Sequence, residues 1–381
     1  MDLSTSSESS EDTQRELYDS ILDNDLELFG NSLRTREAQN PIQKTNFWSD
    51  VYPSLGVASY KQRYRMRWES MEKLILDLEI NCHSNHKSNW EKGVVSTIDY
   101  MASKCRIKDL VMLYDISQGL VFNLVNHCIT ILGSVLLPNV CKWPSESELR
   151  ANAAKFKEQY SLPLCVGAVD GTLINIYGMG DGKADLTSRK SSYALNLLLV
   201  CDYDGKIIYF VNGAPGSLAD SSIYQSSQLE SQISQKLENS VCSRDNFYIL
   251  SDNGLPCDKH IVTPFIDDGK LSTQQLKFNF YIQRGRAIIE RVNGMLKQRY
   301  QCINGVMRAG TLEKAERMIL ASIALHNYSI LNNDLNLYAH RFNNLDANDD
   351  SFYNAFGYNF EDIDEYSDTR DKIYNFINDL D

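Results

Sequence analysis

The sequence predicts an α/β fold, with a mixed sheet flanked by helices and a helical region before it. Two patterns lead to this prediction. Before residue 161 apolar residues recur at helical spacing, and after it short apolar runs of strand length alternate with helical segments. We therefore divide the chain into an acidic, Ser-rich tail (1–40), a helical region (41–160), an α/β domain (161–335) and an acidic, aromatic tail (336–381).

The helical region begins with helices expected over 68–80, 92–103 and 107–137. Pro138 and Pro144 interrupt this pattern. Ser145 and Glu148 then form a plausible capping box for a further helix over 146–160.

Residues 107–130 have the layout of a helix-turn-helix, with a turn at 115–117. The second helix contains no Lys or Arg, and its apolar residues have the pattern of a core. Without a phosphate contact such a helix binds DNA poorly, so we favour a structural role over sequence reading.

The α/β domain starts with an apolar run at 165–169 that ends at Asp170. Two strands at 194–201 and 206–211 follow, joined by a hairpin turn at 202–205. A helix is expected over 218–237. The later elements are a strand at 247–250, a weaker strand at 260–264 and a long helix over 284–300.

Four acidic residues lie where these elements would direct carboxylates into a shared cleft. Asp170 closes the first strand, Asp252 follows the fourth, and Asp220 lies near the start of a helix. Glu290 belongs to a polar helix face at helical spacing with Arg286, Asn293 and Lys297. A carboxylate at the end of a buried strand is costly unless a cation compensates it, so the set predicts a divalent metal site.

This order of strand, hairpin, helix, strand and acidic helix is that of an RNase H-like core. Residues 64–327 resemble the PIF/Harbinger transposases and the nucleases derived from them. The blocks that carry the resemblance are WPSESEL (143–149), VGAVDGT (166–172), YALNLLLVCDYDGKI (193–207), GAPGSLADSSIYQSSQL (213–229), LSDNG (250–254), FN (278–279), RAIIERVNGMLKQRY (286–300) and LHN (325–327). No block is specific alone, but eight in order form a strong signal.

The resemblance implies that Asp170, Asp220, Asp252 and Glu290 are catalytic metal ligands of a DDE-type site. Either Asp220 or Asp252 could be the second member of the triad, and its position after the fourth strand favours Asp252. Many relatives carry histidine where this chain has Leu173 and Ala219, a change that leaves every carboxylate in place.

The function implied is that of a DNA endonuclease using two Mg²⁺ or Mn²⁺ ions, in the nucleus, with strand transfer as a further step. A Myb-like DNA-binding partner protein and a homo-oligomer are also implied. The alternative is a domesticated transposase that acts as a non-catalytic adaptor on DNA or chromatin.

Net charge at first argues against a nucleic-acid partner, because the chain carries −12 with a pI near 5.1. The ends account for this, since residues 1–30 and 341–381 contribute −8 each and the remainder carries +4. Residues 277–308 hold seven basic residues against one acid. From this segment we expect DNA contacts by five residues, namely Arg284, Arg286, Arg291, Lys297 and Arg299.

Other classes have weaker support in the sequence. The start lacks the basic and apolar segments of a signal peptide, and no apolar run approaching the length of a membrane span is evident. Nine scattered cysteines contain no CxxC pair, and the cluster of Cys82, His83 and His86 lacks a second ligand pair for zinc. GAPGS at 213–217 lacks the lysine of a phosphate loop. The aromatic tail would recruit a partner or screen the DNA cleft.

Overall fold

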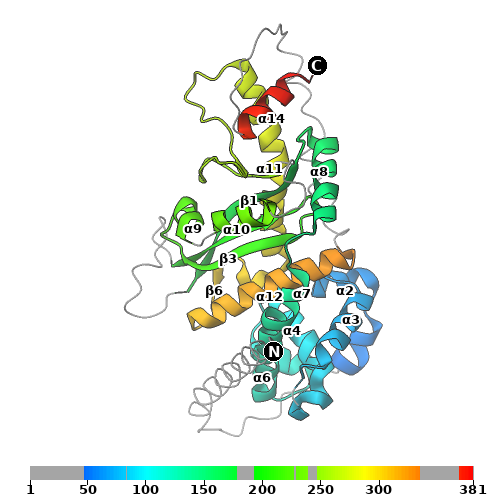
Figure 1. The fold of residues 1–381 in the computed structure, drawn as a ribbon. Helices are drawn as coiled ribbons and strands as arrows, with labels where there is room; N and C mark the ends of the chain where they lie inside the picture. Colours follow the sequence, from blue (N-terminus) through cyan, green and yellow to red (C-terminus); the bar gives the residue numbers. More distant parts are fainter. Residues whose placement is uncertain are drawn as a thin grey trace, which may run out of the picture.

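The computed structural model describes residues 47–82, 84–177, 193–226, 229–238, 247–334 and 369–380. The predicted tail 1–40 and most of the predicted tail 336–381 lie outside these residues. The described part combines a sheet with helices on both faces and a bundle of N-terminal helices, as expected (Figure 1).

The sheet has the strand order β3-β2-β1-β4-β5. The first three strands are antiparallel neighbours, and β4 and β5 run parallel to β1. A short strand β6 pairs with the end of β1. The bounds are β1 Cys165–Ile176, β2 Ala194–Cys201, β3 Ile207–Pro215, β4 Tyr248–Leu250, β5 Ile261–Val262 and β6 Val306–Met307. This order, with three antiparallel strands followed by two parallel ones, is that of an RNase H-like core.

Strand β1 is longer than the sequence predicted. The expectation that Asp170 closes the strand is wrong, because β1 continues for six residues beyond it to Ile176. The extension is paired on both sides, with β2 along its length and with β6 at Asn175 and Ile176. Asp170 therefore lies in the middle of a strand.

The hairpin between β2 and β3 is confirmed. Gly205 adopts a φ of 78°, which favours glycine, and the backbone N–H of Lys206 donates to Asp202 Oδ1 at 2.8 Å. This turn fixes the register of the two strands.

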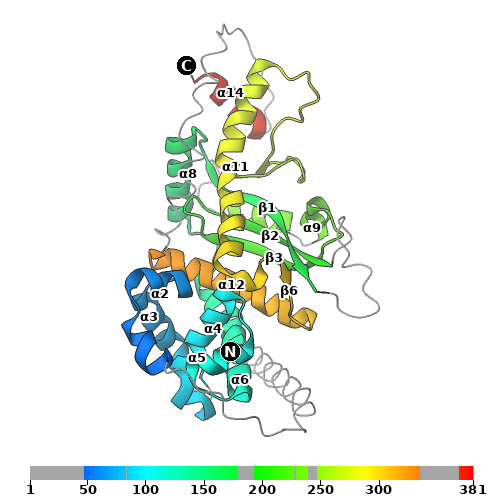
Figure 2. The same ribbon diagram turned by 180° about the vertical axis from the view of Figure 1, so that it is seen from behind.

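Helix α11 (Thr273–Arg299) covers one face of the sheet and runs along it from the C-terminal helix to the helical region (Figure 2). It begins eleven residues before the predicted start, because Ser272 and Gln275 form a capping box. At Gly285 the helix approaches the sheet so closely that a Cβ would lie 2.5 Å from Leu162 and 2.7 Å from Leu250.

The opposite face is covered by α9 (Asp220–Ser226) and α10 (Leu229–Glu238). Ile223, Tyr224 and Ile233 share a core cluster with Val169 and Leu198 of the sheet. These two helices occupy the span for which the sequence predicted one helix, and Asp220 is the first residue of α9.

The helical region confirms most of the predicted helices. Its α-helices are α2 (Val57–Tyr64), α3 (Trp68–Glu79), α4 (Trp90–Ser103), α5 (Ile107–Tyr114), α6 (Gln118–Ile131), α7 (Leu137–Val140) and α8 (Glu146–Tyr160), with short 3-10 and π segments η1 (Phe47–Val51), η2 (Tyr52–Ser54), η3 (Ser84–Asn89) and η4 (Leu132–Leu136). The capping box of α8 forms as expected. Helices α5 and α6 have the predicted helix-turn-helix layout, and Val121, Leu124 and Val125 of α6 are buried.

Residues Gln118–Val140 have the length and apolar composition of a membrane span, a feature that the sequence analysis did not recognise. Most of this segment is buried within the protein, where it packs against α4 and α12 (Leu312–Leu331). It has the environment of a core helix.

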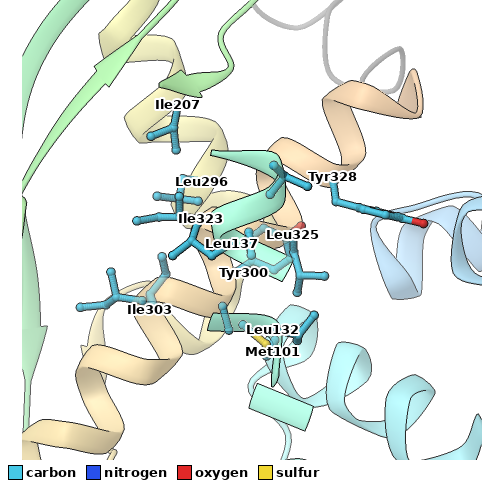
Figure 3. Packing of buried hydrophobic residues seen from close by; sticks show 14 of the residues in the cluster. Met101, Leu132, Leu137, Ile207, Leu296, Tyr300, Ile303, Ile323, Leu325 and Tyr328 are labelled. Atoms are coloured by element: carbon cyan, nitrogen blue, oxygen red, sulfur yellow. The ribbon is translucent and has the colours of Figure 1, made fainter. Parts of the chain in front are cut away.

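Helix α12 lies between the sheet and the helical region and was not predicted as an element. Buried side chains from both sides meet around it (Figure 3), including Met101 of α4, Leu132 of η4, Ile207 of β3 and Leu296 of α11. The short 3-10 helix η6 (Gln301–Ile303) precedes α12 in the chain. It contacts both α4 and α12 and completes this junction. The two regions share one continuous apolar core.

The LHN block belongs to this junction. Asn327 is fully buried, accepts from Ile207 N at 2.8 Å and donates to Ile207 O at 2.7 Å and to Val140 O at 3.1 Å. His326 Nε2 lies 2.9 Å from Gly205 O, and burial lowers the pKa of this imidazole to about 4. Both residues connect α12 to the start of β3, which is a structural role.

The C-terminal helix α14 (Thr369–Asn378) folds back onto the first turns of α11 and the loop before it. The ring of Tyr374 packs edge-on against Phe265 and Phe278, and Ile377 is fully buried. Lys277 Nζ donates to Leu380 O at 2.7 Å. This part of the predicted tail is thus an ordered element of the fold.

Candidate active site

Asp170 lies within β1, and Asp252 lies two residues beyond the end of the neighbouring parallel strand β4. Ala168 of β1 pairs with Leu250 of β4, and each acid lies two residues further along. Ala168 belongs to the core beneath α11, so strand alternation directs Asp170 toward that face. Asp252 is close enough for its charge to raise the pKa of Asp170. Asp252 Oδ1 accepts the N–H of Gly254 at 2.8 Å, which shapes the turn after β4.

The polar face of α11 contacts β1 from this side, as the helical spacing predicted. Asn293 Nδ2 donates to Asp170 Oδ2 at 3.0 Å. One turn further, Lys297 Nζ donates to Thr172 Oγ1 at 2.6 Å and to Leu173 O at 3.0 Å. The amide therefore orients the carboxylate of Asp170, and an ammonium lies next to it along the strand.

Arg286 bridges two of the predicted acids. Its Nη2 forms an ion pair with Glu290 Oε1, one helical turn along, and its Nη1 lies 4.0 Å from Asp170 Oδ1. The side chain of Arg286 is 18% exposed, whereas that of Glu290 is 54% exposed. A guanidinium therefore occupies the space between Asp170 and Glu290.

Asp220 approaches β1 from the opposite face. Asn196 Nδ2 donates to Asp220 Oδ1 at 2.7 Å. Asn196 lies two residues before Leu198 and so on the same face of β2, and Leu198 belongs to the core cluster beneath α9. A Cβ on Gly171 would lie 2.3 Å from Asp220 Oδ2, so only glycine admits this carboxylate so close to the strand. The expectation that all four acids converge in one cleft is corrected, since β1 separates Asp220 from the other three.

The acids nevertheless influence one another. Burial raises the pKa of Asp170 to about 6, Arg286 opposes this shift, and the charges of Asp252, Asp220 and Glu290 add to it. Burial also lowers the pKa of the Lys297 ammonium, with Asp170 working in the opposite direction. The positive charge of Arg286 thus does not offset the combined effect of burial and the neighbouring acids on Asp170.

The donor chemistry of this site fits a hard divalent cation. Carboxylate oxygens are the preferred ligands of Mg²⁺ and Mn²⁺. The carboxylate of Asp220 occupies the space that a side chain at Gly171 would fill. Within the described ranges, however, no three His, Cys, Asp or Glu side chains form a group close enough to hold an ion. The ligands are present around β1 but do not form an assembled cage.

The predicted DNA-binding residues fall into different environments. Arg286 and Lys297 line the acidic site, and Arg284 lies over the ring of Phe280 with its Cζ 5.5 Å from the centroid. Arg291 Nη2 donates to Tyr160 OH of α8 at 3.1 Å.

The prediction that Arg299 contacts DNA is wrong. Its side chain is only 1% exposed, and its guanidinium donates to Arg65 O at 2.8 Å. A buried guanidinium held in this way cannot reach a phosphate, so Arg299 is removed from the expected DNA-contacting set.

Sequence reasoning missed three contributors to the site. Asn196 is the single polar residue in the otherwise apolar strand ALNLLLVC, which is a usable signal. Asn293 was recognised as part of the polar helix face, but its bond to Asp170 was not foreseen. Gly171 carries no signal in one sequence, because its importance depends on where Asp220 lies in the fold.

Residues 169–327 match the family described as the DDE superfamily endonuclease. This part of the chain, which we call the DDE domain, is therefore similar to the DDE superfamily endonucleases. The match begins within β1 and ends in α12 at Asn327, so the DDE domain includes all four acids and the polar face of α11.

Curated relatives confirm the resemblance to Harbinger transposase-derived proteins. The chain is 23% identical over 222 residues to the Xenopus laevis protein named "Putative nuclease HARBI1", covering 56% of this chain and 60% of that protein. It is 28% identical over 198 residues to "Protein ALP1-like" of Arabidopsis thaliana, covering 49% and 48%. The human "Putative nuclease HARBI1" is 27% identical over 188 residues, covering 49% and 51%.

The matched segment thus spans about half of each relative, rising to 60% for the frog protein. Among solved structures, a pre-cleavage Mos1 transpososome is matched with 13% identity and a TM-score of 0.19, covering 61% of this chain and 75% of that chain. At this TM-score the match carries no structural argument, and the fold assignment rests on the strand order of the DDE domain.

Proposed function

We propose that this protein is a divalent-metal-dependent DNA endonuclease with DDE-type phosphodiester hydrolysis, and that strand transfer is a further capacity of the same site. The observation that carries the proposal is the environment of Asp170. Burial raises the pKa of this carboxyl to about 6, and the charges of three nearby acids add to the shift. Such a site is costly without a bound cation, which supports a metal-binding role.

Asp170, Asp252 and Glu290 would form the triad that holds the ions. Asp170 lies within β1 and Asp252 lies just beyond the end of β4, and Glu290 on α11 is close enough for its charge to raise the pKa of Asp170. Asp220, for which the resemblance implies the role of an accessory ligand, lies on the far side of β1, where Asn196 holds it against Gly171. This assignment agrees with the position-based preference for Asp252.

Divalent metal held by Asp170, Asp252 and Glu290 would supply Lewis-acid activation of water and stabilisation of the leaving 3′ oxygen. The chain's own residues supply position and charge. Asn293 holds Oδ2 of Asp170, and Oδ1 lies on the side of Arg286. Lys297 places a positive charge along the strand beside Asp170, where it would attract a phosphate.

The test is cleavage of supercoiled and linear DNA by the full chain in Mg²⁺, Mn²⁺ or EDTA, together with Asp170→Asn and Glu290→Gln variants. We expect metal-dependent nicking that both variants lose while their circular dichroism spectra stay native. An Asp204→Asn variant, altered at an exposed aspartate of the β2–β3 turn, should cleave normally. Retained cleavage by purified Asp170→Asn would refute the assignment.

A second candidate is a non-catalytic adaptor on DNA or chromatin. The absence of an assembled three-ligand group among the described residues favours it. DNA binding without cleavage at any metal concentration, with and without a Myb-like partner protein, would support the adaptor. Nuclear localisation, such a partner and a homo-oligomer remain proposals that follow from the resemblance.

A further inference from the structure

Arg286 is the cation that lies between Asp170 and Glu290 in the acidic site. Its guanidinium pairs with Glu290 and lies 4.0 Å from Asp170, so it neutralises two of the acids proposed as metal ligands. It is also mostly buried, with 18% of its side chain exposed. This differs from an ordinary surface arginine, which keeps its charged head in water.

Local helix energetics do not explain this placement. An exposed Arg and Glu four residues apart stabilise a helix only weakly, and the order with the acid first is the better one. In α11 the arginine comes first. The placement therefore depends on the combined charge of Asp170 and Glu290 rather than on the helix alone.

We propose that Arg286 is a positioning residue that substitutes for the metal in the metal-free protein and is released to bind a DNA phosphate when a divalent ion enters. This inference rests on the proposed nuclease function. The guanidinium and an ion cannot both occupy the space between Asp170 and Glu290, so metal binding must displace the arginine. A displaced arginine at the edge of the site offers a planar pair of donors suited to phosphate.

This exchange also accounts for the absence of an assembled metal cage in the described residues. Glu290 is turned along its own helix toward Arg286, with 54% of its side chain exposed. Release of Arg286 would free Glu290 to turn toward Asp170. The arrangement makes metal binding and DNA binding mutually favourable, because each one stabilises the released position of the arginine.

The first measurement is Mn²⁺ binding to the full chain, followed by the electron paramagnetic resonance signal of free Mn²⁺. Arg286→Gln removes the competing cation, so we expect its Kd for Mn²⁺ to fall by about tenfold relative to the unmodified chain. Arg286→Lys, with its charge kept and its fork lost, should give an intermediate Kd. Arg150→Gln is the matched control, because it breaks another Glu–Arg pair four residues apart, in α8, and should leave the Kd unchanged.

The second measurement is binding of a DNA duplex by fluorescence anisotropy over a range of salt concentrations, in Ca²⁺ and in EDTA. In Ca²⁺ the slope of log affinity against log salt should be smaller by about one for Arg286→Gln, which lacks one phosphate contact. In EDTA the slopes of the variant and the unmodified chain should agree. Arg150→Gln should match the unmodified chain in both conditions.

The outcomes separate this inference from the proposed function. If the unmodified chain and Arg286→Gln bind Mn²⁺ equally well, the exchange is wrong and the nuclease proposal stands. If neither the unmodified chain nor any variant binds Mn²⁺, both fail. If Arg286→Gln does not fold, Arg286→Lys decides, because an unchanged Kd in that variant overturns the exchange.

Discussion

Replacing Asp170 with asparagine should make the metal-free protein more stable at neutral pH. Burial and three neighbouring acids raise the pKa of this carboxyl from 3.8 to about 6. A raised acid pKa means that the folded state holds the proton more tightly than the unfolded state does. The contribution of Asp170 to stability is therefore fully present below pH 3.8 and is lost as the pH rises through 6.

The size of the effect follows from the shift. Each pKa unit corresponds to about 1.4 kcal/mol, so the ionised carboxylate costs the folded state about 3 kcal/mol at pH 7.5 and about 1 kcal/mol at pH 4.5. Asparagine removes this cost and has nearly the same shape. Its amide can also donate to Asn293 Oδ1, which is buried without a hydrogen-bond partner.

The assay is equilibrium urea unfolding in EDTA at pH 7.5 and pH 4.5, followed by circular dichroism. Asp170→Asn should gain about 3 kcal/mol at the higher pH and clearly less at the lower pH. Asp204→Asn, changed at an exposed position, should shift by no more than about 0.5 kcal/mol.

Adding Mn²⁺ should then stabilise the unmodified chain but not Asp170→Asn, because a ligand stabilises only the state that binds it. Equal stability of Asp170→Asn and the unmodified chain at pH 7.5 would refute the electrostatic account of the site. A gain that does not depend on pH would also contradict it.

Three further predictions concern other parts of the fold. Gly171→Ala should push Asp220 away from β1 and reduce DNA cleavage by about tenfold, while the circular dichroism spectrum stays native. Gly294→Ala is the control and should cleave DNA normally, because a Cβ at Gly294 meets nothing within 4 Å. Asn327→Ala should lower the free energy of unfolding in urea by about 3 kcal/mol, because three buried backbone groups lose their partner. Ile377→Asp should release α14, which hydrogen exchange would detect as faster exchange in residues 273–282, and unchanged exchange there would contradict the packing.

Local sequence signals predicted the parts of the fold that depend on local chemistry. The turn at Gly205 and the capping box of Ser145 were recognised because a few neighbouring residues determine them. The polar face of α11 was also predicted, since helical spacing alone places Glu290, Asn293 and Lys297 together.

The misses depend on contacts between distant segments. The extension of β1 requires pairing with β6, more than a hundred residues further along the chain. The position of Asp220 depends on Asn196 and on the space above Gly171, which no spacing rule describes. The burial of Arg299 follows from its contact with Arg65, which lies in another region of the chain. A single sequence gives residue types, but only the packed fold shows which side of a strand each one reaches.

The apolar core around α12 determines which fragments of this chain can fold when they are expressed alone. The DDE domain match starts inside β1, and the nearest predicted boundary falls at residue 161, yet the apolar cluster passes without a break from Met101 and Leu132 to Leu296 and Leu325. A fragment that begins at residue 161 would expose to water the side of α12 that the helical bundle covers. We therefore expect the shorter piece to aggregate when expressed alone, and the N-terminal helices to fold together with the α/β domain as one unit.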